Sequence, residues 1–320
     1  MKNKLKKIVV LFIKILIGVF SFWIIYNRLV ETPQFKTQCL FWFREPKMYC
    51  ILCFVLCLMP INWGIESYKW KLITRQIENI NYSTALKSVF SGICVGNLAP
   101  GRAMEFLAKI FYFKKENRPG ITILHFINGM FQMLITIIVG IISITAKFQK
   151  TESSPFTYII LIGGFCMILF FCWAIFNASY IQQKLKFIKW FQKFNSSHKI
   201  EFSINLILKL VSLSILRYIV FTTQFYLIYN ALTPQNEIIS AFMSIAAYFM
   251  LTSLIPMISV IEPAIRAAIA LFVFNNIGDN SVIVILSSTF VWIINVVFPS
   301  IIGYIIILRE KIDFKFTNAN

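Results

Sequence analysis

Two short stretches of the sequence carry ionisable residues whose types and spacing could do chemistry. The first places Arg102, Glu105 and Lys109 after a proline and a glycine, and the second places Glu262 and Arg266 after a proline. In both stretches a cation follows the acid by four residues, so the two side chains share one face of a helix. No nucleophile or base pair accompanies them, and we therefore expect binding of a charged group rather than enzymatic catalysis.

The two stretches together define the predicted substrate site. Its residues are Asn97, Pro100, Gly101, Arg102, Glu105, Lys109, Pro256, Glu262 and Arg266. A proline–glycine break frees backbone groups, and a half-helix beginning near Gly101 would direct partial positive charge into its surroundings beside Arg102. Phosphate is the group that such an arrangement binds well. A purely architectural role, in which the ion pairs only allow broken helices to be buried, stays open.

The composition indicates the kind of protein that must position these residues. Only 14% of the chain is charged and 58% is hydrophobic, whereas a soluble domain carries about a quarter charged residues. Apolar segments extend from residue 8 to residue 308, with no polar stretch between them long enough for a separate core. We therefore predict a single membrane domain over 1–320. A charge within it would cost about 2.5–3.5 kcal/mol on insertion scales, so each one requires a reason.

The lengths of the apolar segments predict an all-α, polytopic membrane helix bundle. Crossing the hydrocarbon core takes about 20 apolar residues. Six segments are predicted to be full spans: 8–26, 48–65, 121–146, 156–177, 204–229 and 282–308. Two further segments, 84–113 and 238–274, are interrupted by the two charged stretches, and we predict that each forms a pair of half-length helices.

The distribution of basic residues predicts the topology. If both interrupted segments are re-entrant hairpins and the N-terminus is cytoplasmic, nineteen Lys and Arg lie on the cytoplasmic side and six outside. A full crossing by either hairpin would reverse everything downstream and weaken this bias. We therefore predict two re-entrant broken-helix hairpins and cytoplasmic N- and C-termini, in a multi-pass protein of the cell inner membrane.

The predicted topology contains an inverted repeat, with one half at about 48–146 and the other at about 204–308. Transporters commonly have this construction, because two such halves can rock about a site at the midplane. Between the halves, residues 180–199 alternate lysines with aromatic and aliphatic residues, which is typical of a basic connector in the headgroup layer. Residues 69–78 resemble an interfacial collar. The oligomeric state is left open, a homo-oligomer included.

Other classes of function find little support. The net charge of +18 sits mainly in short loops between apolar segments, which suits anionic lipid headgroups better than nucleic acid. Cys50 and Cys53 form a Cys-x-x-Cys motif, yet no second pair completes a metal site. We expect no nucleic-acid partner, no metal and no cofactor.

The two charged stretches carry a family resemblance. Residues 97–109 resemble the first signature of the lysylphosphatidylglycerol synthase transmembrane region family, a Pro-Gly-Arg run followed by Gly-Glu and a basic residue. Residues 256–266 are similar to the second signature. Met104 departs from the first signature, where a glycine is usual, and Ile258, Ser259 and Pro263 depart from the second. The resemblance implies a flippase-like membrane domain that transports an anionic or aminoacylated phospholipid or a polyprenyl-linked lipid. A second hypothesis is a non-transporting membrane partner that presents a lipid to a separately encoded transferase.

Overall fold

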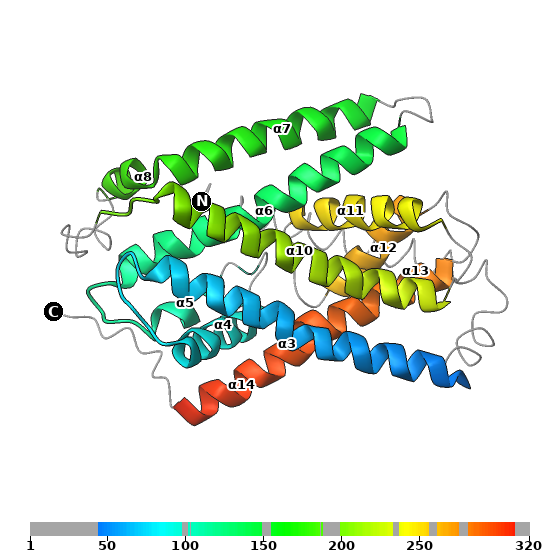
Figure 1. Ribbon diagram of the computed structural model, residues 1–320, viewed down its shortest axis with the longest axis horizontal. Helices are drawn as coiled ribbons and strands as arrows, with labels where there is room; N and C mark the ends of the chain where they lie inside the picture. Colours follow the sequence, from blue (N-terminus) through cyan, green and yellow to red (C-terminus); the bar gives the residue numbers. More distant parts are fainter. Residues whose placement is uncertain are drawn as a thin grey trace, which may run out of the picture. The chain divides into compact units, whose positions relative to one another are not determined.

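A computed structural model describes residues 44–97, 102, 104–148, 155–185, 187, 199–232, 237–255, 261–274 and 281–310. All regular elements within these ranges are helices. The longer ones are α3 (Pro46–Thr74), α4 (Tyr82–Gly96), α6 (Arg118–Phe148), α7 (Pro155–Phe176), α10 (Ile204–Leu232), α11 (Ile238–Leu254), α12 (Glu262–Phe274), α13 (Ser281–Trp292) and α14 (Phe298–Glu310). Two short helices, α5 (Glu105–Ile110) and α8 (Ala178–Leu185), complete this part of the chain (Figure 1). The all-α prediction is confirmed for these ranges.

Within the described residues, five helical stretches are long and apolar enough to cross a membrane. They are Pro46–Thr74, Arg118–Ala146, Tyr158–Phe176, Ile204–Leu232 and Ser281–Glu310. Each coincides with a predicted span, and the sixth predicted span, 8–26, lies outside the described residues. These helices are consistent with a multi-pass integral membrane protein.

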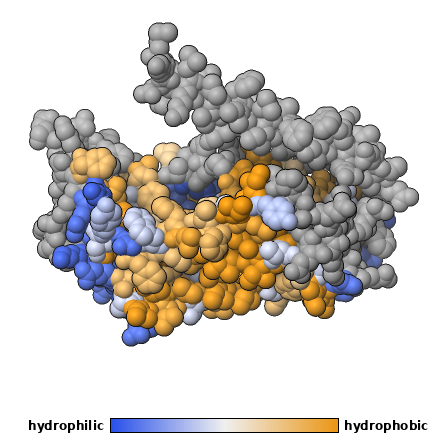
Figure 2. Space-filling model, turned by 90° about the horizontal axis from the view of Figure 1, so that it is seen from above, coloured by the Kyte–Doolittle hydropathy of each residue, from blue (hydrophilic) through white to orange (hydrophobic). Residues whose placement is uncertain are grey.

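The outer faces of the helices are suited to lipid contact. On α7 the exposed fraction of the side chain is 65% for Ile162 and 71% for Phe176, and Phe165 and Trp173 are also exposed. Apolar side chains cover most of the described surface visible in Figure 2. Apolar surface on this scale would drive aggregation in water and is ordinary in a bilayer.

The interrupted segments break where predicted. Within 84–113, α4 ends at Gly96 and α5 begins at Glu105; within 238–274, α11 ends at Leu254 and α12 begins at Glu262. Helix α5 has only six residues, so the first break does not produce two half-helices of similar length. The second pair comes closer to that prediction, since α11 has 17 residues and α12 has 13.

The described residues divide into two compact units. The first unit consists of the described parts of 44–60, 136–161 and 219–295, and the second of those of 61–135, 162–218 and 296–310. The first unit contains α11, α12 and α13, which pack side by side. Its core is rich in aromatic rings; Phe225 stacks on Phe274 with the ring centroids 5.8 Å apart, and Tyr229 packs against Phe274 at 5.0 Å.

The second unit contains α4, α5 and α14. Helix α4 packs against both of the others, as Figure 1 also shows. Gly303 permits the approach of α14, because a Cβ atom at this position would lie 2.0 Å from the carbonyl oxygen of Phe90 on α4. Asn97, which caps α4, donates a hydrogen bond to the Ser300 hydroxyl on α14. This packing leaves the end of α4 beside the charged stretch that follows it.

The helix that ends the described chain is not regular throughout. Residues Ile293–Val297 form a π-helix between α13 and α14. Pro299 follows within α14, and proline can neither donate to the carbonyl four residues earlier nor fit against it. A local widening of the helix accommodates such a residue, and π-helical turns are often found at functional sites.

Candidate functional site

Helix α5 is held against α4 at two glycines. A Cβ atom at Gly92 would lie 2.9 Å from Lys109 Cγ, and one at Gly96 would lie 3.0 Å from Glu105 Cβ. The Ser88 hydroxyl on α4 donates to the carbonyl oxygen of Lys109. The absence of side chains at these glycines therefore lets the charged residues of α5 lie directly on α4.

Glu105 pairs with the two cations that flank it in the sequence. Its carboxylate lies 2.8 Å from Lys109 Nζ and 3.6 Å from Arg102 Nε. The Lys109 side chain is 1% exposed, and its ammonium lies 5.0 Å from the centre of the Trp70 ring. The predicted pairing of Glu105 with Lys109 is confirmed. The Lys109 ammonium therefore contacts both the Glu105 carboxylate and the face of the Trp70 ring.

Arg102 is the least constrained cation of this group. Its φ is 56°, in the left-handed region that residues other than glycine rarely adopt. Its side chain is 34% exposed, and its buried Nη2 atom has no hydrogen-bond partner among the described residues. Backbone strain of this kind is concentrated at ligand and active sites, and here it occurs at a cation with one nitrogen that has no hydrogen-bond partner among the described residues.

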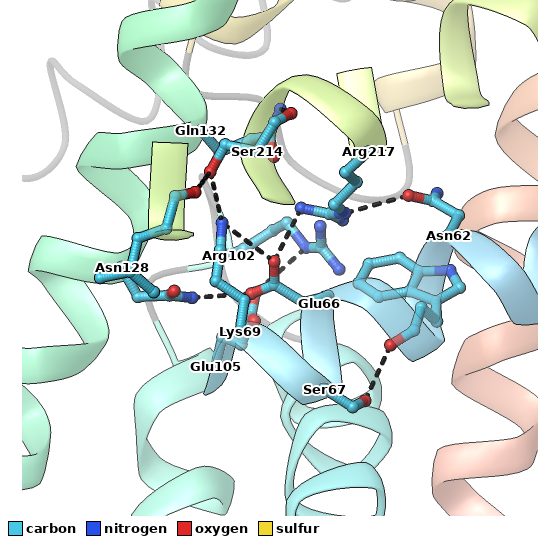
Figure 3. A network of polar contacts seen from close by, with 12 residues as sticks. Asn62, Glu66, Ser67, Lys69, Arg102, Glu105, Asn128, Gln132, Ser214 and Arg217 are labelled. Atoms are coloured by element: carbon cyan, nitrogen blue, oxygen red, sulfur yellow. Dashed lines mark hydrogen bonds and ion pairs between the residues drawn. The ribbon is translucent and has the colours of Figure 1, made fainter. Parts of the chain in front are cut away.

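A second carboxylate, Glu66 on α3, lies at the centre of a network in the same unit. It is 3.3 Å from Lys69 Nζ and 3.1 Å from Arg217 Nη1, and it accepts a hydrogen bond of 2.7 Å from Asn128 Nδ2. The Glu66 side chain is 7% exposed and that of Lys69 is fully buried. Figure 3 shows these side chains converging from α3, α6 and α10.

Further hydrogen bonds orient the cations of this network. Arg217 donates from Nε to Asn62 Oδ1 at 3.0 Å, and Lys69 donates to the Ser214 hydroxyl at 3.2 Å. The guanidinium carbon of Arg217 lies 4.7 Å from the centre of the Trp63 ring, and that of Arg102 lies 5.9 Å from the same ring. Two guanidinium groups therefore share one indole.

We refer to the six ionic residues of this region as the charge cluster. They are Glu66, Lys69, Arg102, Glu105, Lys109 and Arg217. Four cations face two carboxylates, so the cluster has an excess of two positive charges. All six belong to the second unit.

A pocket lies further along two of the same helices. It has a volume of about 370 Å³ and is lined by Leu72, Arg75, Gln76, Ser203, Asn205, Leu206 and Lys209. Arg75 follows Lys69 by six residues on α3, and Lys209 precedes Arg217 by eight on α10. At about 1.5 Å per residue, the pocket is about 10 Å from the charge cluster along the helix axes.

The predicted pair of the second charged stretch lies in the first unit. Arg266 Nε is 2.8 Å from Glu262 Oε1, and Arg266 also hydrogen-bonds the hydroxyl of Tyr248. Glu262 and Tyr248 are buried. The predicted ion pair is confirmed. It consists of one acid and one cation, so it carries no excess charge of the kind found in the second unit.

The other predicted site residues have different outcomes. Pro100, Gly101 and Pro256 lie outside the described residues. Asn97 bonds the Ser300 hydroxyl on α14 and so has a part in helix packing. Helix α5 begins at Glu105 rather than near Gly101.

Sequence reasoning missed Glu66 and misplaced Lys69. The span predicted at 48–65 was expected to end before an interfacial collar at 69–78, but α3 continues to Thr74 and buries Lys69 completely. That part of the collar prediction was wrong. A usable signal existed, because Asn62, Glu66 and Lys69 are spaced at i, i+4 and i+7 and so share one helix face.

Comparisons with known proteins do not identify a family. No family model matches the chain, and no curated protein sequence matches it. The functional argument therefore depends on the geometry of the site.

Proposed function

We propose that the chain is a membrane lipid transporter that binds the anionic headgroup of a lipid at the charge cluster. The observation that carries this proposal is the excess of two positive charges in a group whose members are buried or half-buried. Unbalanced charge is costly among apolar helices, and a bound anion would balance it.

The donors of the cluster suit phosphate in particular. Arg102 and Arg217 present planar guanidinium groups, which can bind phosphate oxygens in bidentate fashion. The Nη2 atom of Arg102 and the indole nitrogen of the buried Trp63 have no hydrogen-bond partner among the described side chains and backbone groups. We assign phosphate binding to Arg102 and Arg217, whereas Glu66 and Glu105 hold the cations in position.

The pocket supports a route to this site for the headgroup. Arg75 and Lys209 line it, so a basic pocket lies on the same two helices as Glu66, Lys69 and Arg217 of the cluster. In our proposal a phosphate group first binds at Arg75 and Lys209 and then moves along these helices to Arg217. Its acyl or prenyl chains would remain against the apolar outer faces of the helices.

The proposal includes the finer topology expected from the sequence. In it, α4 with α5 and α11 with α12 are re-entrant hairpins, and the two halves of the chain are inverted repeats in the inner membrane with cytoplasmic termini. The breaks at Gly96 and Leu254 support this reading. The resemblance to the lysylphosphatidylglycerol synthase transmembrane region family suggests lipid transport, and we propose membership in that family on the motifs alone.

Reconstitution into liposomes tests this function. Purified protein would be incorporated with fluorescent phosphatidic acid, phosphatidylglycerol or phosphatidylcholine, and leaflet exchange would be followed by quenching from outside. We expect exchange of an anionic lipid by the wild type and its loss in Arg217→Gln. Lys87→Gln is the matched control, because Lys87 pairs with Glu310 on the exposed surface of the same unit. Equal exchange by all three proteins would contradict the proposal, and binding without exchange would favour a lipid-presenting partner.

A further inference from the structure

The charge balance of the cluster limits the kind of anion that it can hold. Each carboxylate lies between two cations: Glu66 between Lys69 and Arg217, and Glu105 between Arg102 and Lys109. A carboxylate with two cationic neighbours is held in its ionised form. The excess of two positive charges therefore does not depend on an unusual protonation state of either acid.

The region around the excess charge is largely closed to water. Lys69 is fully buried, Arg217 is 14% exposed, and Trp63, over which both guanidinium groups lie, is 4% exposed. At an effective dielectric constant of about 20, one uncompensated unit charge within about 5 Å of a ligand charge changes the binding constant by roughly 250-fold. Solvent at the partly exposed Arg102 reduces this effect, so we expect the binding constants of a dianion and a monoanion to differ by at least about tenfold.

We infer that the charge cluster selects a phosphate group with two negative charges, a phosphomonoester or a pyrophosphate, over a phosphodiester with one. A dianion balances the cluster, whereas a phosphodiester leaves one positive charge unbalanced. This inference rests on the proposed function and narrows its substrate class. Common diester phospholipids and their aminoacylated forms bind more weakly, and lipids that end in a phosphomonoester or contain a pyrophosphate bind more tightly.

Binding of short-chain lipids to the purified protein in a neutral detergent tests the preference. The probes are dioctanoyl phosphatidic acid, a phosphomonoester; dioctanoyl phosphatidylglycerol, a phosphodiester; and dioctanoyl phosphatidylcholine, which has no net charge. Affinity is measured by native mass spectrometry. At about pH 7 we expect phosphatidic acid to bind at least about tenfold more tightly than phosphatidylglycerol. At about pH 5 the monoester has lost most of its second charge, since its second pKa is about 6, and the preference should fall to about threefold or less.

Variants that change the excess charge in opposite directions separate the effect of charge in the cluster from that of the total charge of the protein. Lys69→Met lowers the excess to one positive charge, and the preference for phosphatidic acid should fall at least about fivefold. Glu66→Gln raises the excess, and the preference should not fall. If Lys69→Met does not fold, Arg102→Gln also removes one positive charge from the cluster, at a partly exposed position. Lys87→Gln changes the total charge of the protein equally but lies outside the cluster, and its preference should match the wild type.

The outcomes are distinct from those that test transport. Equal or tighter binding of phosphatidylglycerol by the wild type would overturn the inference, as would a preference that Lys69→Met and Arg102→Gln leave unchanged. Simultaneous binding of two phosphatidylglycerol molecules at the cluster, removed by Arg217→Gln, would also overturn it. Binding of none of the anionic lipids would instead refute the proposed function. Inorganic phosphate and pyrophosphate are tested separately as competitors of phosphatidic acid. If they displace the lipid at concentrations similar to its own, the ligand is a dianion from a soluble source. If they displace it only weakly, the dianion belongs to a lipid.

Discussion

Replacing Glu66 by glutamine removes the central acceptor of the charge cluster while keeping the size of the side chain. Glu66 neutralises Lys69 at 3.3 Å and Arg217 at 3.1 Å, and both cations would stay buried after the change. Breaking a buried pair by removing one partner costs about 3–5 kcal/mol. Arg217 keeps its bond to Asn62, and Lys69 keeps its bond to Ser214, so we expect a loss at the lower end, about 3 kcal/mol.

The assay is unfolding of the purified protein in mixed micelles, with the free energy of unfolding compared between variants. The control Glu310→Gln removes an acid from an exposed pair with Lys87 and should change stability by less than about 1 kcal/mol. The double change Glu66→Gln with Lys69→Met removes a cation together with the acid and should recover part of the loss. A cost for Glu66→Gln no larger than that for Glu310→Gln would refute the reasoning that this carboxylate holds buried cations.

Further changes test other parts of the account. Gly303→Ala would place a methyl group 2.0 Å from a backbone oxygen of α4 and should lower the free energy of unfolding by at least about 2 kcal/mol. The control is Gly129→Ala, which should have little effect on the free energy of unfolding because its Cβ would contact nothing within 4 Å. Tyr248→Phe removes a hydrogen bond to Arg266 and should cost about 2 kcal/mol without changing anion affinity, since neither residue belongs to the charge cluster. In a variant whose other cysteines are replaced by alanine, the exposed Cys57, in the middle of α3, should resist maleimides in intact vesicles, because the reactive thiolate does not form in hydrocarbon, and should react once the protein is unfolded in detergent. Rapid reaction with a membrane-impermeant maleimide in intact vesicles would contradict the assignment of α3 as a span.

Much of the helical organisation could be predicted from the sequence. The apolar segments are long, and charged residues are costly within them, so hydropathy alone located five of the helices. The breaks after Gly96 and Leu254 were also predictable, because a proline and an ion pair interrupt each segment. The pairing of Glu105 with Lys109 followed from helical spacing and needed no tertiary information.

The composition of the site could be predicted only in part. Glu66 and Lys69 lie where the hydropathy of α3 falls, and their burial depends on α6 and α10, which lie far away in the sequence. A one-dimensional pattern cannot distinguish a polar helix end in the headgroup layer from one that packs inside a bundle. Arg217 is a cation within the apolar segment 204–229, but its carboxylate partner is 151 positions away. Tertiary contact therefore decides which cations the cluster contains.

The most direct test of the central claim is whether the charge cluster binds an anionic lipid. Native mass spectrometry of the wild type, Arg217→Gln and Lys87→Gln, each with added dioctanoyl phosphatidic acid and phosphatidylcholine, would measure this. We predict that the wild type and Lys87→Gln retain phosphatidic acid in preference to phosphatidylcholine, and that folded Arg217→Gln loses at least about nine-tenths of that binding. Undiminished binding of phosphatidic acid by folded Arg217→Gln would contradict the claim.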